Sequence, residues 1–141
     1  MLRLLTALFF SFIILDPVSA KDLTPADRIA VQQVISGQLE AFKADNGPLA
    51  YSFAAPLVTK IFPTVDIFMA MVKRGYQAVY TNSQYKFGEI GADTLGRPAQ
   101  HVTITAGDGK RYEAIYAMEK QPDGSWKIAG VQMVEIPGLD A

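Results

Sequence analysis

The stretch that decides the fold is residues 111–136, which read RYEAIYAMEK, then QPDGS, then WKIAGVQMVEI. In the first ten residues apolar and aromatic side chains alternate with polar ones, the pattern of a strand with one buried face. Asp123-Gly124 supplies the positive φ angles that a tight hairpin turn requires. Trp126–Ile136 predicts a second strand, whose alternation slips around Ala129-Gly130 and indicates a bulge or bend. We therefore expect a long antiparallel hairpin.

The residues just before this hairpin predict further strands of the same sheet. Gln100–Thr105 alternates, and Gly107-Asp108-Gly109 is a hairpin turn that leads into Arg111. Tyr85–Ile90 and Tyr76–Tyr80 are short and rich in aromatic and β-branched residues, so we expect a strand at each. Gly91–Arg97 is expected to be a loop.

Helices are predicted in the residues from 24 to 75. Thr24 caps a first helix, Pro25 suits its first position, and apolar residues recur at helical spacing to about Ala44. Further helices are expected at Leu49–Ala54, Pro56–Phe62 and Val65–Arg74, the last with Gly75 as a left-handed C-cap. Helices followed by an antiparallel meander predict an α+β fold, in which the helices fill the concave face of a strongly curved sheet.

Residues 1–20, MLRLLTALFFSFIILDPVSA, show the three parts of a secretory signal peptide. Arg3 gives a positive start, Leu4–Leu15 is too short to span a bilayer comfortably, and Val18-Ser19-Ala20 has the small residues of a cleavage site. We expect cleavage after Ala20, with a retained N-terminal anchor as the alternative. Cleavage would leave a single domain, residues 21–141, periplasmic or secreted, with no stable membrane insertion.

Composition excludes several classes of function. The 141 residues include one His and no Cys, so no multi-histidine or thiolate metal site and no disulfide is expected. A net charge of −1 argues against nucleic acid as a partner. We expect no metal and no cofactor.

The sequence also resembles a known family. Residues 121–128, QPDGSWKI, carry most of the resemblance to domain of unknown function 4864, a family of small exported bacterial proteins. Other matching residues are Phe62-Pro63-Thr64, Phe68–Val72, Gly75-Tyr76, Tyr116 and Gly130. The resemblance covers about residues 27–134 and implies a nuclear-transport-factor-2-like, or cystatin-like, cone of helices wrapped by a bent sheet. It implies no activity and no functional residue.

Tyrosines and carboxylates are the groups left for chemistry. Folds of the resembled superfamily often keep a pocket between sheet and helices, where in some relatives a Tyr hydroxyl and an acid perform isomerisation or dehydration. Ordinary packing in the core and on the strands would explain the presence of the same tyrosines without any functional site. The candidate pocket residues are Tyr51, Asp66, Tyr76, Tyr112 and Tyr116.

Two hypotheses about function follow. The first is a non-catalytic periplasmic domain that binds a small apolar ligand or a protein partner. The second is a pocket enzyme of the isomerase or dehydratase type, which uses a Tyr and a buried carboxylate. We assign no catalytic residue, and by analogy with sheets that pair face to face we consider a homodimer.

Overall fold

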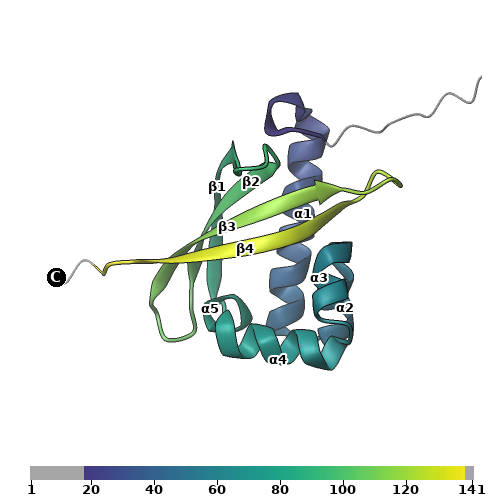
Figure 1. The fold of residues 1–141 in the computed structure, drawn as a ribbon. Coiled ribbons are helices and arrows are strands. Elements are labelled where there is room, and N and C mark those ends of the chain that lie inside the picture. Colours follow the sequence, from purple (N-terminus) through teal and green to yellow (C-terminus); the bar gives the residue numbers. More distant parts are fainter. Residues whose placement is uncertain (1–17, 139–141) are drawn as a thin grey trace, which may run out of the picture.

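A computed structural model describes residues 18–138, so most of the predicted signal peptide lies outside the described residues. The short 3₁₀ helix η1 (Ala20–Asp22) precedes five α-helices and four strands. The strands form one antiparallel sheet in the order β1-β2-β3-β4. Helix α1 crosses the inner face of this sheet, and α4 runs beneath its β4 side (Figure 1). This arrangement confirms the predicted α+β class. The element bounds are α1 Pro25–Lys43, α2 Gly47–Ser52, α3 Pro56–Ile61, α4 Val65–Gly75, α5 Gln77–Tyr80, β1 Gln84–Ala92, β2 Pro98–Thr105, β3 Arg111–Lys120 and β4 Trp126–Ile136.

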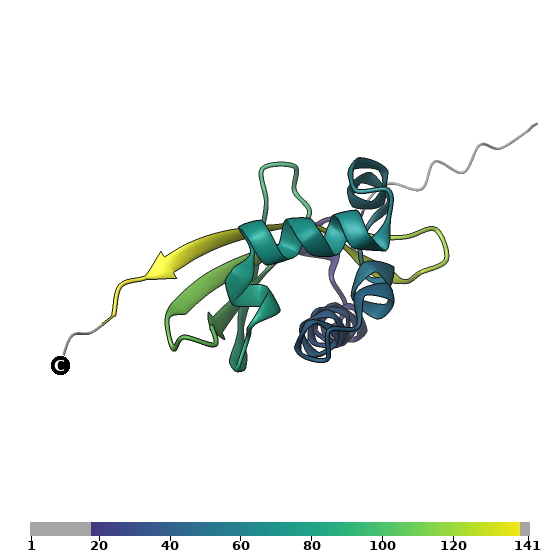
Figure 2. The ribbon, with the colours of Figure 1, turned by 90° about the horizontal axis from the view of Figure 1, so that it is seen from below.

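Helix α1 begins at a reciprocal cap, in which Thr24 is the N-cap that the sequence predicts. The Thr24 hydroxyl accepts from the backbone N–H of Asp27, and the Asp27 carboxylate accepts from the backbone N–H of Thr24. One face of the helix is fully buried against the sheet through Val31, Ile35 and Leu39. Seen from below, α1 lies nearly end-on beside α2, while α4 extends across the view (Figure 2).

The Asp27 side chain also joins this helix end to the β3–β4 hairpin. Its Oδ1 lies 3.2 Å from Lys120 Nζ and accepts a hydrogen bond from Trp126 Nε1 at 3.3 Å. The hydrogen bond from the Thr24 backbone is the largest of the interactions that lower the pKa of Asp27 to about 2. Trp126 of the QPDGSWKI stretch therefore has a structural partner on α1.

The hairpins and the bulge confirm the turn predictions. Gly109 and Gly124 have φ angles of +85° and +88°, which glycine adopts at little cost. Residue Ala129 has no partner in the β3–β4 register, which passes from Ala117 opposite Gly130 to Met118 opposite Ile128. The bulge therefore lies where the alternation of the sequence slips.

Tyr76–Tyr80 is not a strand, contrary to the sequence-based prediction. Residues 77–80 form α5, and the N–H groups of Val79 and Tyr80 donate to the Tyr76 carbonyl. Gly75 is the last residue of α4 rather than a left-handed cap, because its φ is not positive and the chain turns directly into α5. Tertiary packing of Ala78 and Val79, both buried, outweighs the strand propensity of this segment.

Strand β4 is an edge strand that is partly covered by the connection between α2 and α3. The residues Phe53–Ala55, here called the edge segment, run parallel to β4. Ile128 N–H donates to the Phe53 carbonyl, and Ala55 N–H donates to the Ile128 carbonyl, both at 2.8 Å. Within residues 18–138 no helix combines the length and hydropathy needed to cross a membrane.

Candidate functional site

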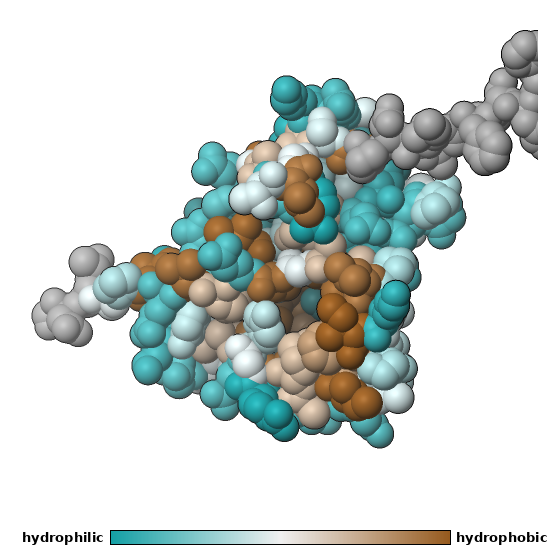
Figure 3. All heavy atoms as spheres, viewed as in Figure 1, coloured by the Kyte–Doolittle hydropathy of each residue, from teal (hydrophilic) through white to brown (hydrophobic). Residues whose placement is uncertain are grey.

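An apolar cavity of about 300 Å³ lies between β4 and helices α3 and α4. In the space-filling view, apolar residues gather around a hollow in the middle of this face (Figure 3). Leu57 and Ile61 at its rim are 59% and 61% exposed. The lining residues are Gln38, Phe42, Ala54, Leu57, Val58, Ile61, Phe62, Phe68, Met71, Val72, Tyr76, Val79, Ile128, Ala129, Gly130 and Val131.

The α3 wall of the cavity is set by local sequence. Pro56 occupies the first turn of α3, and the preceding Ala54 is small enough to approach the backbone of β4. Leu57 and Ile61, four residues apart, therefore project from the same side of α3. The Tyr51 hydroxyl donates to the Phe62 carbonyl at 2.7 Å, which ties the end of α3 back to α2.

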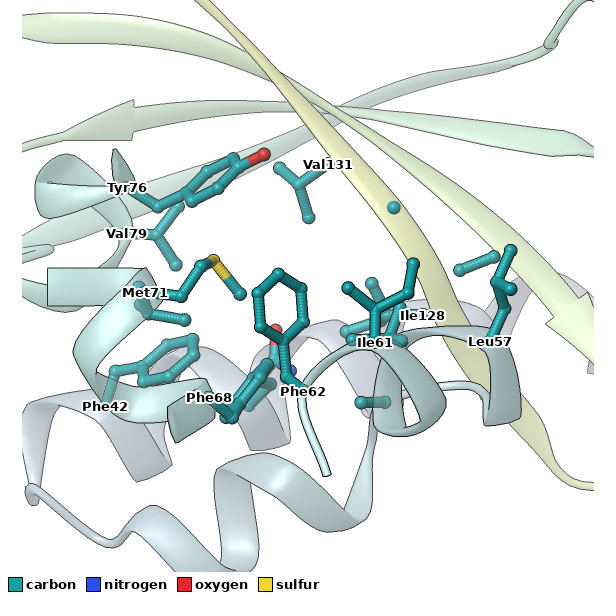
Figure 4. A pocket seen from close by; sticks show the side chains of 16 residues that line it. Phe42, Leu57, Ile61, Phe62, Phe68, Met71, Tyr76, Val79, Ile128 and Val131 are labelled. Atoms are coloured by element: carbon teal, nitrogen blue, oxygen red, sulfur yellow. The ribbon is translucent and has the colours of Figure 1, made fainter. Parts of the chain in front are cut away.

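The opposite wall comes from α4 and the turn that follows it. Met71 and Phe62 face each other across the cavity, and the Tyr76 ring lies above them with its hydroxyl directed toward Val131 (Figure 4). The Tyr76 hydroxyl makes no hydrogen bond within the described part of the chain. Tyr76 therefore offers the cavity one unused polar group in an apolar wall.

Two of the residues that line the cavity have polar side chains, Tyr76 and Gln38 of α1. Gln38 is 4% exposed, and its Nε2 donates to the Ala50 carbonyl at 3.1 Å. Sequence reasoning missed Gln38, since a single Gln in an amphipathic helix carries no signal that distinguishes it from a surface residue. Only the approach of α2 to α1 reveals its position.

The five residues predicted to form a pocket are not brought together. Tyr76 lines the cavity, and Tyr51 supports the α3 wall from outside the lining. Asp66 is exposed in the first turn of α4, and Tyr112 is half-buried on β3. Tyr116 is fully buried, its hydroxyl has no partner, and burial raises the pKa of this phenol.

Tyrosine–carboxylate pairs do occur, but at the surface. The Tyr80 hydroxyl donates to Asp45 at 2.8 Å, and the Tyr85 hydroxyl donates to Glu40 at 3.0 Å. The Tyr80 hydrogen bond is the main cause that lowers the pKa of Asp45, and Lys43 followed by Tyr85 lowers that of Glu40. Neither pair contributes to the cavity, whose lining contains no Asp, Glu or His.

The single His lies on the opposite face of the sheet. His101 Nδ1 pairs with the Glu113 carboxylate, and both side chains are part-exposed. Among residues 18–138 no group of three or more His, Asp or Glu side chains is placed to hold a metal ion.

Comparison with known proteins places the chain in a family. The model of a family named domain of unknown function (DUF4864) matches residues 24–141. The chain belongs to this family. The DUF4864 match begins at Thr24, the cap of α1, so it includes every α-helix and strand of the described structure. No curated protein and no solved structure matches the chain.

Proposed function

We propose that this DUF4864 protein is an exported, non-catalytic binding domain whose cavity accepts a small apolar ligand. The apolar lining of the cavity carries the proposal, because ligand sites are concave and mostly apolar with few polar groups. Its volume of about 300 Å³ is at the lower end of the range for small-molecule sites. The exposed Leu57 and Ile61 side chains would be covered by the bound ligand.

The cavity favours binding over isomerisation. An enzyme of the isomerase or dehydratase type needs a general base within hydrogen-bond reach of the substrate, together with a donor for the developing oxyanion. Tyr76 would supply a donor, but the lining residues include no carboxylate or imidazole to act as the base. The two tyrosine–carboxylate pairs of the surface lie elsewhere.

Export and the wider fold family are parts of the same proposal. The apolar run Leu4–Leu15 and the small residues before Lys21 support a cleaved signal peptide. A long α1 packed on the inner face of a meander sheet supports a nuclear-transport-factor-2-like cone. In such a cone the space between sheet and helices is the natural ligand site.

The binding proposal is tested with rim variants and the fluorescent apolar probe N-phenyl-1-naphthylamine. We expect the probe to bind with enhanced fluorescence, and the double variant Leu57→Ser/Ile61→Ser to weaken its affinity by about tenfold, the loss of part of two apolar contacts. Both side chains are largely exposed, so the variant is expected to fold normally.

Ile29→Ser is the matched control, because Ile29 is also 59% exposed but lies on α1 outside the cavity lining. This control should bind the probe as the unmodified protein does. Equal affinity of the rim variant and the control, or no probe binding at all, would refute the proposed site.

A further inference from the structure

Gln38 is a polar side chain in an apolar site, where one hydrogen bond holds it to the backbone of α2. It is nearly fully buried and lines the cavity beside Phe42 and Phe68. An amide in such surroundings is costly unless its hydrogen-bonding groups have partners. The position of each of its two polar atoms therefore matters.

One of these atoms is already used. Nε2 donates to the carbonyl oxygen of Ala50, which can only accept, so the orientation of the amide is determined by its partner. The remaining atom is Oε1, and no group within residues 18–138 donates to it. Gln38 lines the cavity and its Oε1 is not sealed inside the protein, so a ligand in the cavity can reach this hydrogen-bond acceptor.

We propose that Gln38 Oε1 selects ligands that carry a neutral hydrogen-bond donor on a small aromatic body. This inference rests on the proposed function and adds the chemical class of the ligand. A carboxylate would meet Oε1 as an acceptor facing an acceptor, and the lining offers it only the neutral Tyr76 hydroxyl as a donor, with no cationic side chain to balance its charge. An ammonium group would have to be desolvated without a counter-charge. A hydroxyl satisfies Oε1 without either penalty.

The lining of the cavity favours a ligand with an aromatic ring system. Phe42, Phe62, Phe68 and the Tyr76 ring offer faces and edges for aromatic contacts, and Met71 adds a polarisable thioether. A volume of about 300 Å³ has room for about ten non-hydrogen atoms, judged from about 30 Å³ per water molecule in the liquid. Two fused rings with one substituent fall within this size.

The test compares three naphthalenes that differ in one group, titrated by calorimetry at neutral pH. The first, 2-naphthol, donates a hydrogen bond; 2-methoxynaphthalene keeps the oxygen without the donor, and 2-methylnaphthalene lacks both. We expect 2-naphthol to bind about tenfold more tightly than either analogue, which is the usual effect of one hydrogen bond.

Gln38→Met should remove this preference, because Met has a similar length but no comparable acceptor. Binding of 2-methylnaphthalene should stay within about threefold of its original affinity. Gln32→Met is the matched control: Gln32 is on the same helix, its Nε2 lies 3.5 Å from Gln100 Oε1, and it does not line the cavity. This control should keep the full preference for 2-naphthol.

If Gln38→Met does not fold, the side-chain amide resonances of Gln38 in the unmodified protein provide the second readout. They should shift on addition of 2-naphthol and not on addition of 2-methylnaphthalene. Equal affinities for all three compounds would overturn the role of Gln38 and leave the apolar site intact. Failure of all three to bind would overturn the proposed function itself.

Discussion

Asp27 is the residue at which the helical and strand halves of the chain meet. Its carboxylate accepts from the backbone and hydroxyl of Thr24, from Lys120 and from the Trp126 indole. The side chain is 12% exposed, so these bonds are only partly screened by water. The sequence predicted the start of the helix at Thr24-Pro25 and a favourable place for an acid in its first turn, but not the return hydrogen bond from Thr24 N–H to Asp27. The contact with Trp126 could not be predicted either, because 99 residues separate the two.

We expect Asp27→Asn to lower the free energy of unfolding by about 1 to 2 kcal/mol, because it weakens a helix cap and charge-assisted hydrogen bonds. The pKa of Asp27 is lowered from 3.8 to about 2, so its stabilisation is complete above pH 4 and is lost as the pH falls through 2. The stability difference between variant and unmodified protein should therefore shrink over that interval.

Urea unfolding at a series of acidic pH values measures this difference. Asp66→Asn is the control. Asp66 lies in the first turn of α4, as Asp27 does in α1, but its side chain is exposed. A constant difference between pH 4 and pH 2 would contradict the assignment.

At the scale of one element, α1 contains a glycine that makes room for the edge segment. A Cβ atom added at Gly37 would lie 2.7 Å from Cζ of Phe53. Glycine inside a helix is ordinarily unfavourable, so its presence here is explained by the close approach of the Phe53 ring. The packing of α2 and the edge segment against α1 depends on this contact.

We expect Gly37→Ala to lower the free energy of unfolding by about 1 kcal/mol, because displacing the Phe53 ring outweighs the gain in helix propensity. Gly75→Ala should instead raise it by about 0.5 to 1 kcal/mol. Gly75 also lies in a helix and has no positive φ, and a Cβ atom added there would meet no tertiary neighbour within 4 Å. Thermal unfolding of the two variants measures whether each substitution lowers or raises stability. Stabilisation by both substitutions would contradict the role given to Phe53.

Residues 76–80 show how packing between elements overrides local propensity. Local propensity favours a strand for a segment of aromatic and β-branched residues, whereas the structure continues α4 into α5. The error mattered for the site, because it is the turn between the two helices that directs Tyr76 into the cavity. The Asp-Gly turns and the bulge at Ala129 were predictable, since each depends on backbone rules that act over a few residues.

For the whole molecule, the order of helices and hairpins was enough to predict the α+β class. The cavity was not predictable, because its walls join helices from residues 38–79 to residues 128–131 of β4, about 50 positions later in the sequence. Of the five candidate residues only Tyr76 reaches it. Tyr116 has the right chemistry but faces the core, where burial leaves its hydroxyl without a partner.

The predicted cleavage after Ala20 falls within η1. A chain that starts at Lys21 loses the hydrogen bond from Ala20 N–H to the Gly96 carbonyl and the packing of Val18 on the core. We expect residues 21–141 to unfold cooperatively and to be about 1 kcal/mol less stable than residues 18–141. Urea titration of the two chains measures the difference. Failure of the shorter chain to fold would argue against cleavage at this position.

The edge segment has a consequence for the rate at which individual backbone amides exchange their hydrogens with solvent. The Ile128 N–H is held by the Phe53 carbonyl on the open side of the sheet, so its hydrogen leaves only when the edge segment moves away from β4. The same movement would widen the cavity at Ala54. The exchange lifetime of this one amide would therefore report how readily the proposed binding site opens to its full width.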